Sequence, residues 1–317
     1  MRYVLFLLLA GCAARPAVEP RRPDRAICFV RGTQTDQQEL WEIQPDGSGA
    51  RRIASRLFIW SGLGWSPDGT RIAALGRVLL IIDRATGECR HAKFAPDPEA
   101  DPPFPAPRWD PLGTSVCYDH CLGTDIYQDS TAPKTTLIRD VYGADWTRHG
   151  GLVANDNALG IRVYEPPTSK GRLLAGYHTV PLGAVTRTNR LLAVRFQHDD
   201  DDRTKPPVFC WIDLETGQTE EVATSGGGYG FAAPDGNHIA WISADRRFRV
   251  TDGAGRVIVS DLPIDMDGDH AYQPMWSWAL DGTALAFIRD RDLWTWSAAD
   301  GKVTRVTTLG DVSYCGW

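Results

Sequence analysis

The fold is decided by one stretch of sequence, Gly64-Trp65-Ser66-Pro67-Asp68-Gly69-Thr70-Arg71-Ile72-Ala73-Ala74-Leu75. It consists of a short apolar segment, a Pro-Asp-Gly turn and a second segment of small and aliphatic residues. Pro67 fixes its own φ, the side chain of Asp68 bonds back to the backbone, and Gly69 supplies the positive φ that the turn needs. The stretch therefore predicts a β-hairpin.

The same pattern recurs along the chain at a regular period. When the last residue of the turn is taken as the marker, the copies end at Gly69, Gly113, Gly150, Asn189, Gly236 and Gly282. Successive markers are 44, 37, 39, 47 and 46 residues apart. A period of this size is typical of propeller blades or solenoid units.

Each repeat also contains a second hairpin, so that one unit consists of four short strands. The turns of these hairpins are found at residues 44–47, 83–87, 213–217, 252–253 and 299–301. In the third and fourth repeats the second hairpin is poorly defined, and the boundaries of those two units stay open.

These units resemble the TolB-like, WD-type β-propeller repeat. In that family a Trp-Ser-Pro-Asp-Gly hairpin is followed by a strand, a Leu-Trp-like strand and an Asp-Gly turn, as in Trp65 to Gly69 and in Leu40-Trp41 before Asp46-Gly47. The resemblance covers residues 26–317. It implies an all-β fold in which the repeats form the blades of a propeller.

The order of strands at the two ends predicts how the ring closes. We name the strands of a blade A to D from the inside outwards. Residues 26–30 then match a B strand, whereas residues 312–317 match an A strand that stops at its Trp. Seven A and seven B strands predict a seven-bladed propeller in which the C-terminal strand completes the N-terminal blade and leaves no open edge. A six-bladed ring is the alternative, and it requires one weak middle unit to be an insertion.

The N-terminus has the pattern of a secretory signal: one positive charge, a short apolar run, and small residues before Cys12. The apolar run is too short to span a bilayer. Leu9-Ala10-Gly11-Cys12 resembles the bacterial lipobox. This implies a signal peptide over residues 1–11, a lipoprotein lipidated on Cys12, and a place in the cell envelope. Ala13 favours the outer membrane. An N-terminal core strand is the alternative.

Residues 12–25 are rich in Pro and Arg and predict an extended tether between the lipid and the propeller. The whole chain has a formal net charge of -6 and a pI near 5.7, with 34 basic residues spread without clusters. This charge pattern argues against nucleic acid or an anionic membrane surface as the main partner.

The cysteines allow two readings. Beyond Cys12 they are Cys28, Cys89, Cys117, Cys121, Cys210 and Cys315. Cys28 and Cys315 fall on strands expected to be neighbours, so a disulfide between them is one hypothesis, and a Cys117–Cys121 pair across a turn is another. The alternative is that most of the cysteines are small buried apolar residues.

In a blade of this kind the A-to-B and C-to-D connections open on one face, which we call the turn face. The B-to-C and D-to-A connections open on the opposite face, which we call the loop face. The long segments all belong to the loop face: residues 31–38, 91–106, 118–125, 197–206, 223–229 and 261–273. Binding residues concentrate on loops held by a rigid scaffold, so a site is expected there, around the channel mouth.

Several candidate binding residues fall on the loop face: His120, His178, His198, Tyr229 and His270. The histidines form a metal centre only if the ring brings them together. Asp265, Asp267 and Asp269 alternate around Gly268, a spacing that suits the oxygen ligands of Ca²⁺. No bidentate Glu follows them, and a solvated turn is the alternative.

Motifs for catalysis are absent from the sequence: it contains no Gly-x-Ser-x-Gly elbow, no His-Glu-x-x-His pair, no P-loop and no paired-Cys zinc motif. We therefore expect a non-catalytic envelope scaffold, exposed to the periplasm, that binds a protein or a glycan and uses no cofactor unless Ca²⁺ is bound. The alternative is a metal-dependent enzyme, similar to a polysaccharide lyase or a hydrolase, with its site at the channel mouth. Whether the protein is an enzyme stays open at this point.

Overall fold

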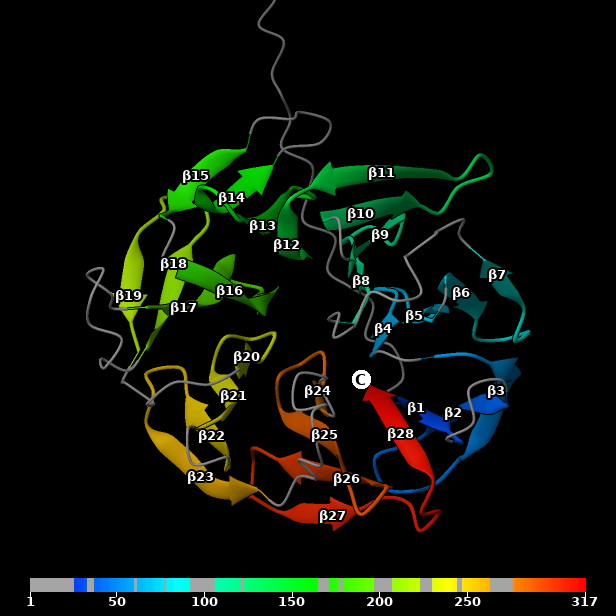
Figure 1. The fold of residues 1–317 in the computed structure, drawn as a ribbon. Helices are drawn as coiled ribbons and strands as arrows, with labels where there is room; N and C mark the ends of the chain where they lie inside the picture. Colours follow the sequence, from blue (N-terminus) through cyan, green and yellow to red (C-terminus); the bar gives the residue numbers. More distant parts are fainter. Residues whose placement is uncertain are drawn as a thin grey trace, which may run out of the picture.

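The computed structural model describes residues 26–32, 37–59, 62–76, 78–91, 106–120, 123–164, 171–176, 179–196, 207–222, 230–243, 247–262 and 276–317. Within these residues the chain forms seven four-stranded antiparallel sheets that are arranged as blades around a ring (Figure 1). The predicted seven-bladed β-propeller is confirmed, and the six-bladed alternative is wrong.

The strands of each blade run from the inside outwards as follows. Blade 1 consists of β28 (Val312–Gly316), β1 (Ile27–Arg31), β2 (Gln38–Ile43) and β3 (Arg51–Leu57); blade 2 of β4 (Leu63–Trp65), β5 (Arg71–Leu75), β6 (Leu79–Asp83) and β7 (Cys89–His91); blade 3 of β8 (Arg108–Trp109), β9 (Ser115–His120), β10 (Gly123–Gln128) and β11 (Lys134–Arg139); blade 4 of β12 (Val141–Trp146), β13 (Leu152–Asp156), β14 (Gly160–Tyr164) and β15 (Arg172–Ala175). Blade 5 consists of β16 (Thr179–Val185), β17 (Arg190–Arg195), β18 (Val208–Asp213) and β19 (Thr219–Glu221); blade 6 of β20 (Gly230–Ala232), β21 (His238–Ile242), β22 (Phe248–Asp252) and β23 (Val257–Leu262); blade 7 of β24 (Trp276–Trp278), β25 (Ala284–Arg289), β26 (Asp292–Ser297) and β27 (Val303–Arg305).

The ring closes as the sequence predicts, because the C-terminal β28 is the inner strand of blade 1. It pairs with β1 in antiparallel register, with Phe29 opposite Cys315 and Val30 opposite Tyr314. In Figure 1 the red β28 lies beside the blue β1. At the loop-face end of this pair the Arg31 guanidinium donates hydrogen bonds of 3.0–3.2 Å to the Asp311 carboxylate. The first and last described strands are therefore joined within one sheet.

The repeated turn has the conformation that its sequence demands. All six markers have positive φ, from 60° at Asn189 to 81° at Gly150. Asparagine is one of the few residues that tolerate this conformation, and it therefore substitutes for glycine in the fifth blade. In the first copy Asp68 accepts hydrogen bonds from the hydroxyl of Ser66 and from the amide of Thr70, which fixes the turn.

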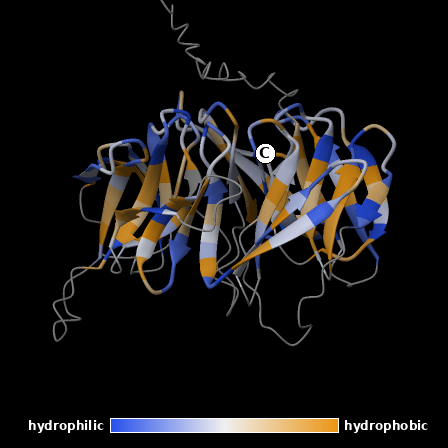
Figure 2. Cartoon of the chain, turned by 90° about the horizontal axis from the view of Figure 1, so that it is seen from above, coloured by the Kyte–Doolittle hydropathy of each residue, from blue (hydrophilic) through white to orange (hydrophobic). Residues whose placement is uncertain are grey.

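The core lies between the blades, and both faces of each sheet contribute to it. In β5, Ile72 and Ala74 pack against blade 1, whereas Ala73 and Leu75 pack against blade 3. The inner and middle strands are therefore nearly continuous apolar runs, and the hydrophilic residues collect at the strand ends and turns (Figure 2).

A repeated tryptophan also links neighbouring blades by hydrogen bonds. The Nε1 atoms of Trp109, Trp146 and Trp278 each donate to a carbonyl of the preceding inner strand, on Gly64, Arg108 and Phe231. The N···O distances are 2.9–3.2 Å. In these three copies the repeated tryptophan is thus an inter-blade contact as well as a core residue.

The hypothesis of a Cys28–Cys315 disulfide is wrong. Because Phe29 and not Cys28 stands opposite Cys315, the two thiols point to opposite faces of the blade 1 sheet. Cys28 packs toward blade 2 and Cys315 toward blade 7. The strands are neighbours as expected, but their register keeps the two sulfur atoms apart.

A second expectation is also corrected. Residues 118–125 do not form a long segment of the loop face, because β9 continues to His120 and β10 begins at Gly123, opposite it. The polar residues Asp119 and Asp125 suggest a loop, yet both are buried within the sheet of blade 3.

Candidate functional site

The loop face is defined by the strand ends that meet there. All of the expected site residues except His120 lie outside the described residues: His178, His198, Tyr229, His270, Asp265, Asp267, Asp269 and the lipidation residue Cys12. The described strands nevertheless fix where the connections begin and end. His178 lies between β15 and β16, His198 between β17 and β18, and the aspartates with His270 between β23 and β24. All of these strand ends lie on the loop face.

His120 is the last residue of β9, and its backbone pairs with Gly123 at the loop-face edge of blade 3. Its side chain lies outside the described part of the chain. Among the described residues, no group of three or more His, Cys, Asp or Glu side chains is arranged to hold a metal ion. The metal predictions for the loop face therefore stay predictions.

A buried polar network joins the inner parts of blades 3 and 4, and sequence reasoning missed it. Asp119 on β9 is only 3% exposed. Its carboxyl group contacts the hydroxyl of Thr124 and accepts a hydrogen bond of 2.8 Å from the amide of Gly143 on β12. Burial raises the pKa of Asp119, and hydrogen bonds from Thr124 and Gly143 lower it less strongly.

The hydroxyl of Thr124 lies between two oxygen atoms, one of the Asp119 carboxyl group and one of the backbone. This hydroxyl also lies 2.8 Å from the carbonyl oxygen of Val141. A hydroxyl has one proton and cannot donate it to two acceptors at once. Both contacts are satisfied if the neutral carboxyl of Asp119 donates to Thr124 and Thr124 donates to Val141. The raised pKa of Asp119 agrees with this arrangement.

Asp145 on β12 is the second buried carboxylate of the network. It accepts a hydrogen bond of 2.6 Å from the amide of Val185 on β16, and Arg108 lies 3.4 Å away as its counter-ion. The pairing of β12 with β13 has a register shift just before Asp145, and the pairing of β16 with β17 has one just before Val185. Such irregularities free backbone amides, which must find other acceptors when buried. The carboxyl oxygens of Asp119 and Asp145 provide those acceptors.

A third buried carboxylate, Asp125 on β10, lies on the opposite side of blade 3. It accepts a hydrogen bond of 3.1 Å from the hydroxyl of Tyr118. Burial, together with the charge of Asp125, raises the pKa of Tyr118 well above its ordinary value. Tyr118 belongs to the apolar cluster between blades 2 and 3. This pair therefore anchors the same blade on its other side.

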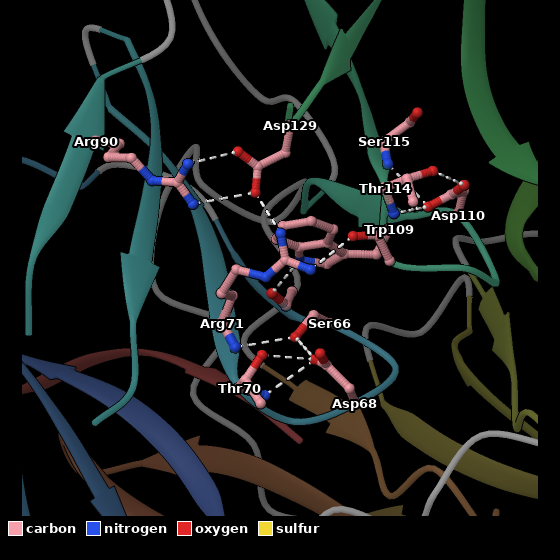
Figure 3. Close-up of polar contacts among 12 residues, drawn as sticks. Ser66, Asp68, Thr70, Arg71, Arg90, Trp109, Asp110, Thr114, Ser115 and Asp129 are labelled. Atoms are coloured by element: carbon pink, nitrogen blue, oxygen red, sulfur yellow. Dashed lines mark hydrogen bonds and ion pairs between the residues drawn. The ribbon is translucent and has the colours of Figure 1, made fainter. Parts of the chain in front are cut away.

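The turn face has its own polar network between blades 2 and 3 (Figure 3). The Arg71 guanidinium forms an ion pair with the carboxylate of Asp129, donates a hydrogen bond of 2.7 Å to the carbonyl of Gly113, and lies 4.7 Å from the ring centroid of Trp109. Arg90 pairs with the same carboxylate at 3.0 Å. One arginine of blade 2 thus contacts two connections and one tryptophan of blade 3.

In each of these described networks, a buried aspartate binds groups of a neighbouring blade. Asp119 and Asp145 bind backbone amides of the inner strands, and Asp129 binds two arginines. Their first effect is to fix neighbouring blades relative to each other. The rigid body that results holds the ends of the loop-face connections in place.

The sequence does contain a signal for these residues. Asp119 follows the apolar run Val116-Cys117-Tyr118, and Asp145 lies between Ala144 and Trp146. A charged residue inside an apolar strand pattern is buried with a partner, because a buried charge without one is too costly.

Neither a protein-family model nor a curated protein sequence matches this chain. Solved β-propeller structures resemble it. TolB from Acinetobacter baumannii gives a TM-score of 0.55 at 16% identity, over 92% of this chain and 66% of that chain. The β-propeller domain of the trilobed protease from Pyrococcus furiosus gives a TM-score of 0.59 at 12% identity, over 89% of this chain and 92% of that chain. Dihydro-haem d1 dehydrogenase NirN gives a TM-score of 0.53 at 12% identity, over 93% of this chain and 77% of that chain.

These likenesses establish the class of protein. The chain is a seven-bladed β-propeller, and its fold resembles those of TolB and of the Pyrococcus propeller domain. It spans 66% of the TolB chain that it matches. The Pyrococcus domain is described as having an open velcro topology, whereas β28 closes the first blade here. In the part of the chain that the structure describes, no helix has the length and apolar character to cross a membrane.

Proposed function

We propose that this protein is a lipid-anchored β-propeller of the bacterial cell envelope that binds a protein or glycan partner through its loop face and catalyses no reaction. The N-terminal pattern that ends at Cys12 supports the anchor, and the Pro- and Arg-rich residues 13–25 support a tether. The fold shared with TolB is compatible with a binding scaffold.

One observation carries the proposal: the two faces of the ring differ. On the turn face, aspartates such as Asp68, Asp83 and Asp213 accept hydrogen bonds from the amides of their own turns. The longest connections between described strands, residues 92–107 and 263–275, join strand ends on the loop face. Long connections on a rigid frame are the usual place for recognition.

The anchor is tested by comparing the wild type with Cys12→Ser in a bacterium that processes lipoproteins. We expect the wild-type protein to be found in the membrane fraction with an acylated N-terminal Cys12 in its mass spectrum. The serine variant should be lost from that fraction, because a thiol is needed for lipidation. A wild-type protein that retains residues 1–11 and is unmodified would contradict the anchor.

Binding through the loop face is tested by replacing residues 197–206, 223–229 and 263–275 in turn with Gly/Ser segments of equal length. The partner is first identified by crosslinking to the wild type in envelope preparations. At least one replacement should abolish its binding while the thermal midpoint is unchanged. The control replaces exposed turn-face residues, for example Leu112→Ser and Glu215→Ser, and should bind as the wild type does.

The enzyme alternative is supported by one feature: four histidines, at positions 120, 178, 198 and 270, belong to connections or strand ends of the same face. Calorimetric titration with Zn²⁺, Mn²⁺ and Ca²⁺ separates the alternatives. Stoichiometric binding that is lost in His178→Ala, His198→Ala or His270→Ala, together with turnover of a polysaccharide, would replace the scaffold by an enzyme. Ca²⁺ binding that is lost in Asp267→Asn would assign that ion to residues 265–269.

A further inference from the structure

The point at which the chain enters the ring indicates how the propeller is oriented. The first described residue, Ala26, is buried and leads directly into β1. β1 runs toward the loop face, because its last residue, Arg31, pairs there with Asp311 and the connection to β2 follows. Ala26 therefore lies on the turn face. The tether of residues 13–25 joins the ring on that face.

The C-terminal strand confirms which end this is. β28 is antiparallel to β1, with Cys28 opposite Gly316, so that Trp317 lies at the same end of the blade as Ala26. The amide of Trp317 donates a hydrogen bond of 2.9 Å to the hydroxyl of Ser277 on β24. The end of β28 is thus tied to the last blade at the same end of blade 1 at which the chain enters the ring.

We propose, on the basis of the lipid anchor proposed above, that the turn face of the propeller lies toward the bilayer and that the loop face points away from it. The partner then approaches from the aqueous side.

The tether reaches the bilayer more directly from the turn face than from the loop face. Residues 13–25 span at most about 45 Å when fully extended. To turn the loop face toward the bilayer, the tether must cross two further strands of blade 1, about 4.8 Å apart, and then pass along strands about 20 Å long. That route takes about 30 Å before side chains and connections are passed. With the turn face toward the bilayer, the whole tether is available as a spacer.

The turn face carries charges of both signs. Eight aspartates at its turns accept amide hydrogen bonds two residues ahead: Asp46, Asp68, Asp83, Asp213, Asp235, Asp252, Asp281 and Asp300. Arg84, Arg148 and Arg187 lie in connections of the same face. Salt screens the interaction of either charge with lipid headgroups beyond about 8 Å, so the orientation rests on the entry of the chain and not on the charge of this face.

Three exposed leucines provide matched probes of the two faces. Leu112, 52% exposed, lies in the turn between β8 and β9 on the turn face. Leu159, 45% exposed, lies between β13 and β14, and Leu309, 42% exposed, lies between β27 and β28, both on the loop face. Their similar exposure means that a label at any of them reports on position and not on burial.

The experiment places azidophenylalanine at position 112, 159 or 309 of the lipidated full chain and couples a fluorescent donor to it. The protein is reconstituted in phosphatidylethanolamine/phosphatidylglycerol vesicles that contain an acceptor lipid. Energy transfer falls steeply with height above the bilayer. We expect transfer from position 112 to exceed transfer from positions 159 and 309 several-fold.

Equal transfer from the three positions, or greater transfer from 159 and 309, would overturn the proposed orientation while the anchor stands. A protein that fails to remain with the vesicles although Cys12 is acylated, or that is not acylated at all, would instead overturn the anchor of the proposed function. A long Gly/Ser insertion after residue 25 is the control, and it should reduce the difference between the two faces.

Discussion

Asp119 and Asp292 are both buried aspartates, but their surroundings shift their pKa values in opposite directions. Asp119 is shielded from water and has few donors, so that burial dominates and its pKa is raised. Burial acts on Asp292 in the same direction, but hydrogen bonds from Arg305, Gly310, Thr307 and Leu309 outweigh it and its pKa is lowered. The two groups therefore give opposite pH dependences of stability.

Asp119→Asn is expected to retain the network, because an amide can donate to Thr124 and accept from Gly143 as the neutral acid does. A raised pKa in the folded state means that the contribution of Asp119 is full below its unfolded pKa, near 3.9, and is lost as pH rises through the folded pKa. The wild type should therefore lose stability relative to Asp119→Asn as pH rises above about 4. Urea unfolding of both proteins over this range measures their free energies of unfolding, and a wild-type stability that stays constant or rises relative to that of Asp119→Asn would contradict the neutral state.

Asp292→Asn should show the reverse trend. The lowered pKa means that Asp292 stabilises the fold above its unfolded pKa, near 3.9, and that this contribution is lost as pH falls through the folded pKa. At neutral pH we expect a loss of about 1–3 kcal/mol, because one charged acceptor of buried donors is removed. The loss should shrink in acid. The same urea series tests it, and a loss that grows in acid would count against the assignment.

The ion pairs of Asp129 provide a test of the inter-blade contacts on the turn face. Asp129 is almost fully buried, Arg71 is largely buried, and Arg90 is about half exposed. Arg71→Met should lower the free energy of unfolding by about 2–4 kcal/mol, because it removes a buried charge partner, a hydrogen bond and a stacked contact. Arg90→Met is the matched control and should cost about 1 kcal/mol or less. Equal losses in the two variants would show that the contact with blade 3 is not the cause.

At the residue scale the sequence predicts turn chemistry well and buried polar chemistry poorly. Pro67, Asp68 and Gly69 act within a few residues, so that their roles can be read locally. The partners of Asp119 and Asp145 come from neighbouring blades, at Gly143 and Val185. Which amides lose their ladder partners depends on the register shifts of β12 and β16, and no local pattern shows them.

At the scale of the strands, the repeat predicts which strands pair but not always their limits or register. The closing pair of β1 and β28 was predicted from strand order, whereas the Cys28–Cys315 hypothesis failed because a shift of one residue moves a side chain to the other face. Residues 118–125 were expected to form a long connection, but the ladder of β9 and β10 continues to His120 and Gly123. Asp119, a polar residue in this stretch, is buried between blades.

Closure by β28 makes a prediction about truncation. Deleting residues 313–317 removes the inner strand of blade 1 and leaves the edge of β1 unpaired, so that the thermal midpoint should fall sharply. Deleting residues 13–25 is the control, and it should leave the midpoint unchanged because the ring begins at β1. Calorimetric unfolding of the two truncated proteins checks this, and an unchanged midpoint in the first would refute the role of the closing strand.

At the scale of the whole molecule, the ring is a rigid body with two unlike faces. Apolar contacts on both sides of every blade, the tryptophan hydrogen bonds and the buried ion pairs fix the blades relative to one another. The number of blades and the closure of the ring can be predicted from the repeat in the sequence. The identity of the partner cannot be predicted in this way, because recognition depends on the side chains of the connections and not on the repeat that builds the frame.

The most direct test of the account is photo-crosslinking in living cells from the two faces of the lipidated protein. A photoreactive residue replaces Leu159 or Leu309 on the loop face, or Leu112 on the turn face. We predict that the same partner is crosslinked from position 159, from position 309 or from both, and not from position 112. A partner captured from position 112 and from neither loop-face position would contradict the account.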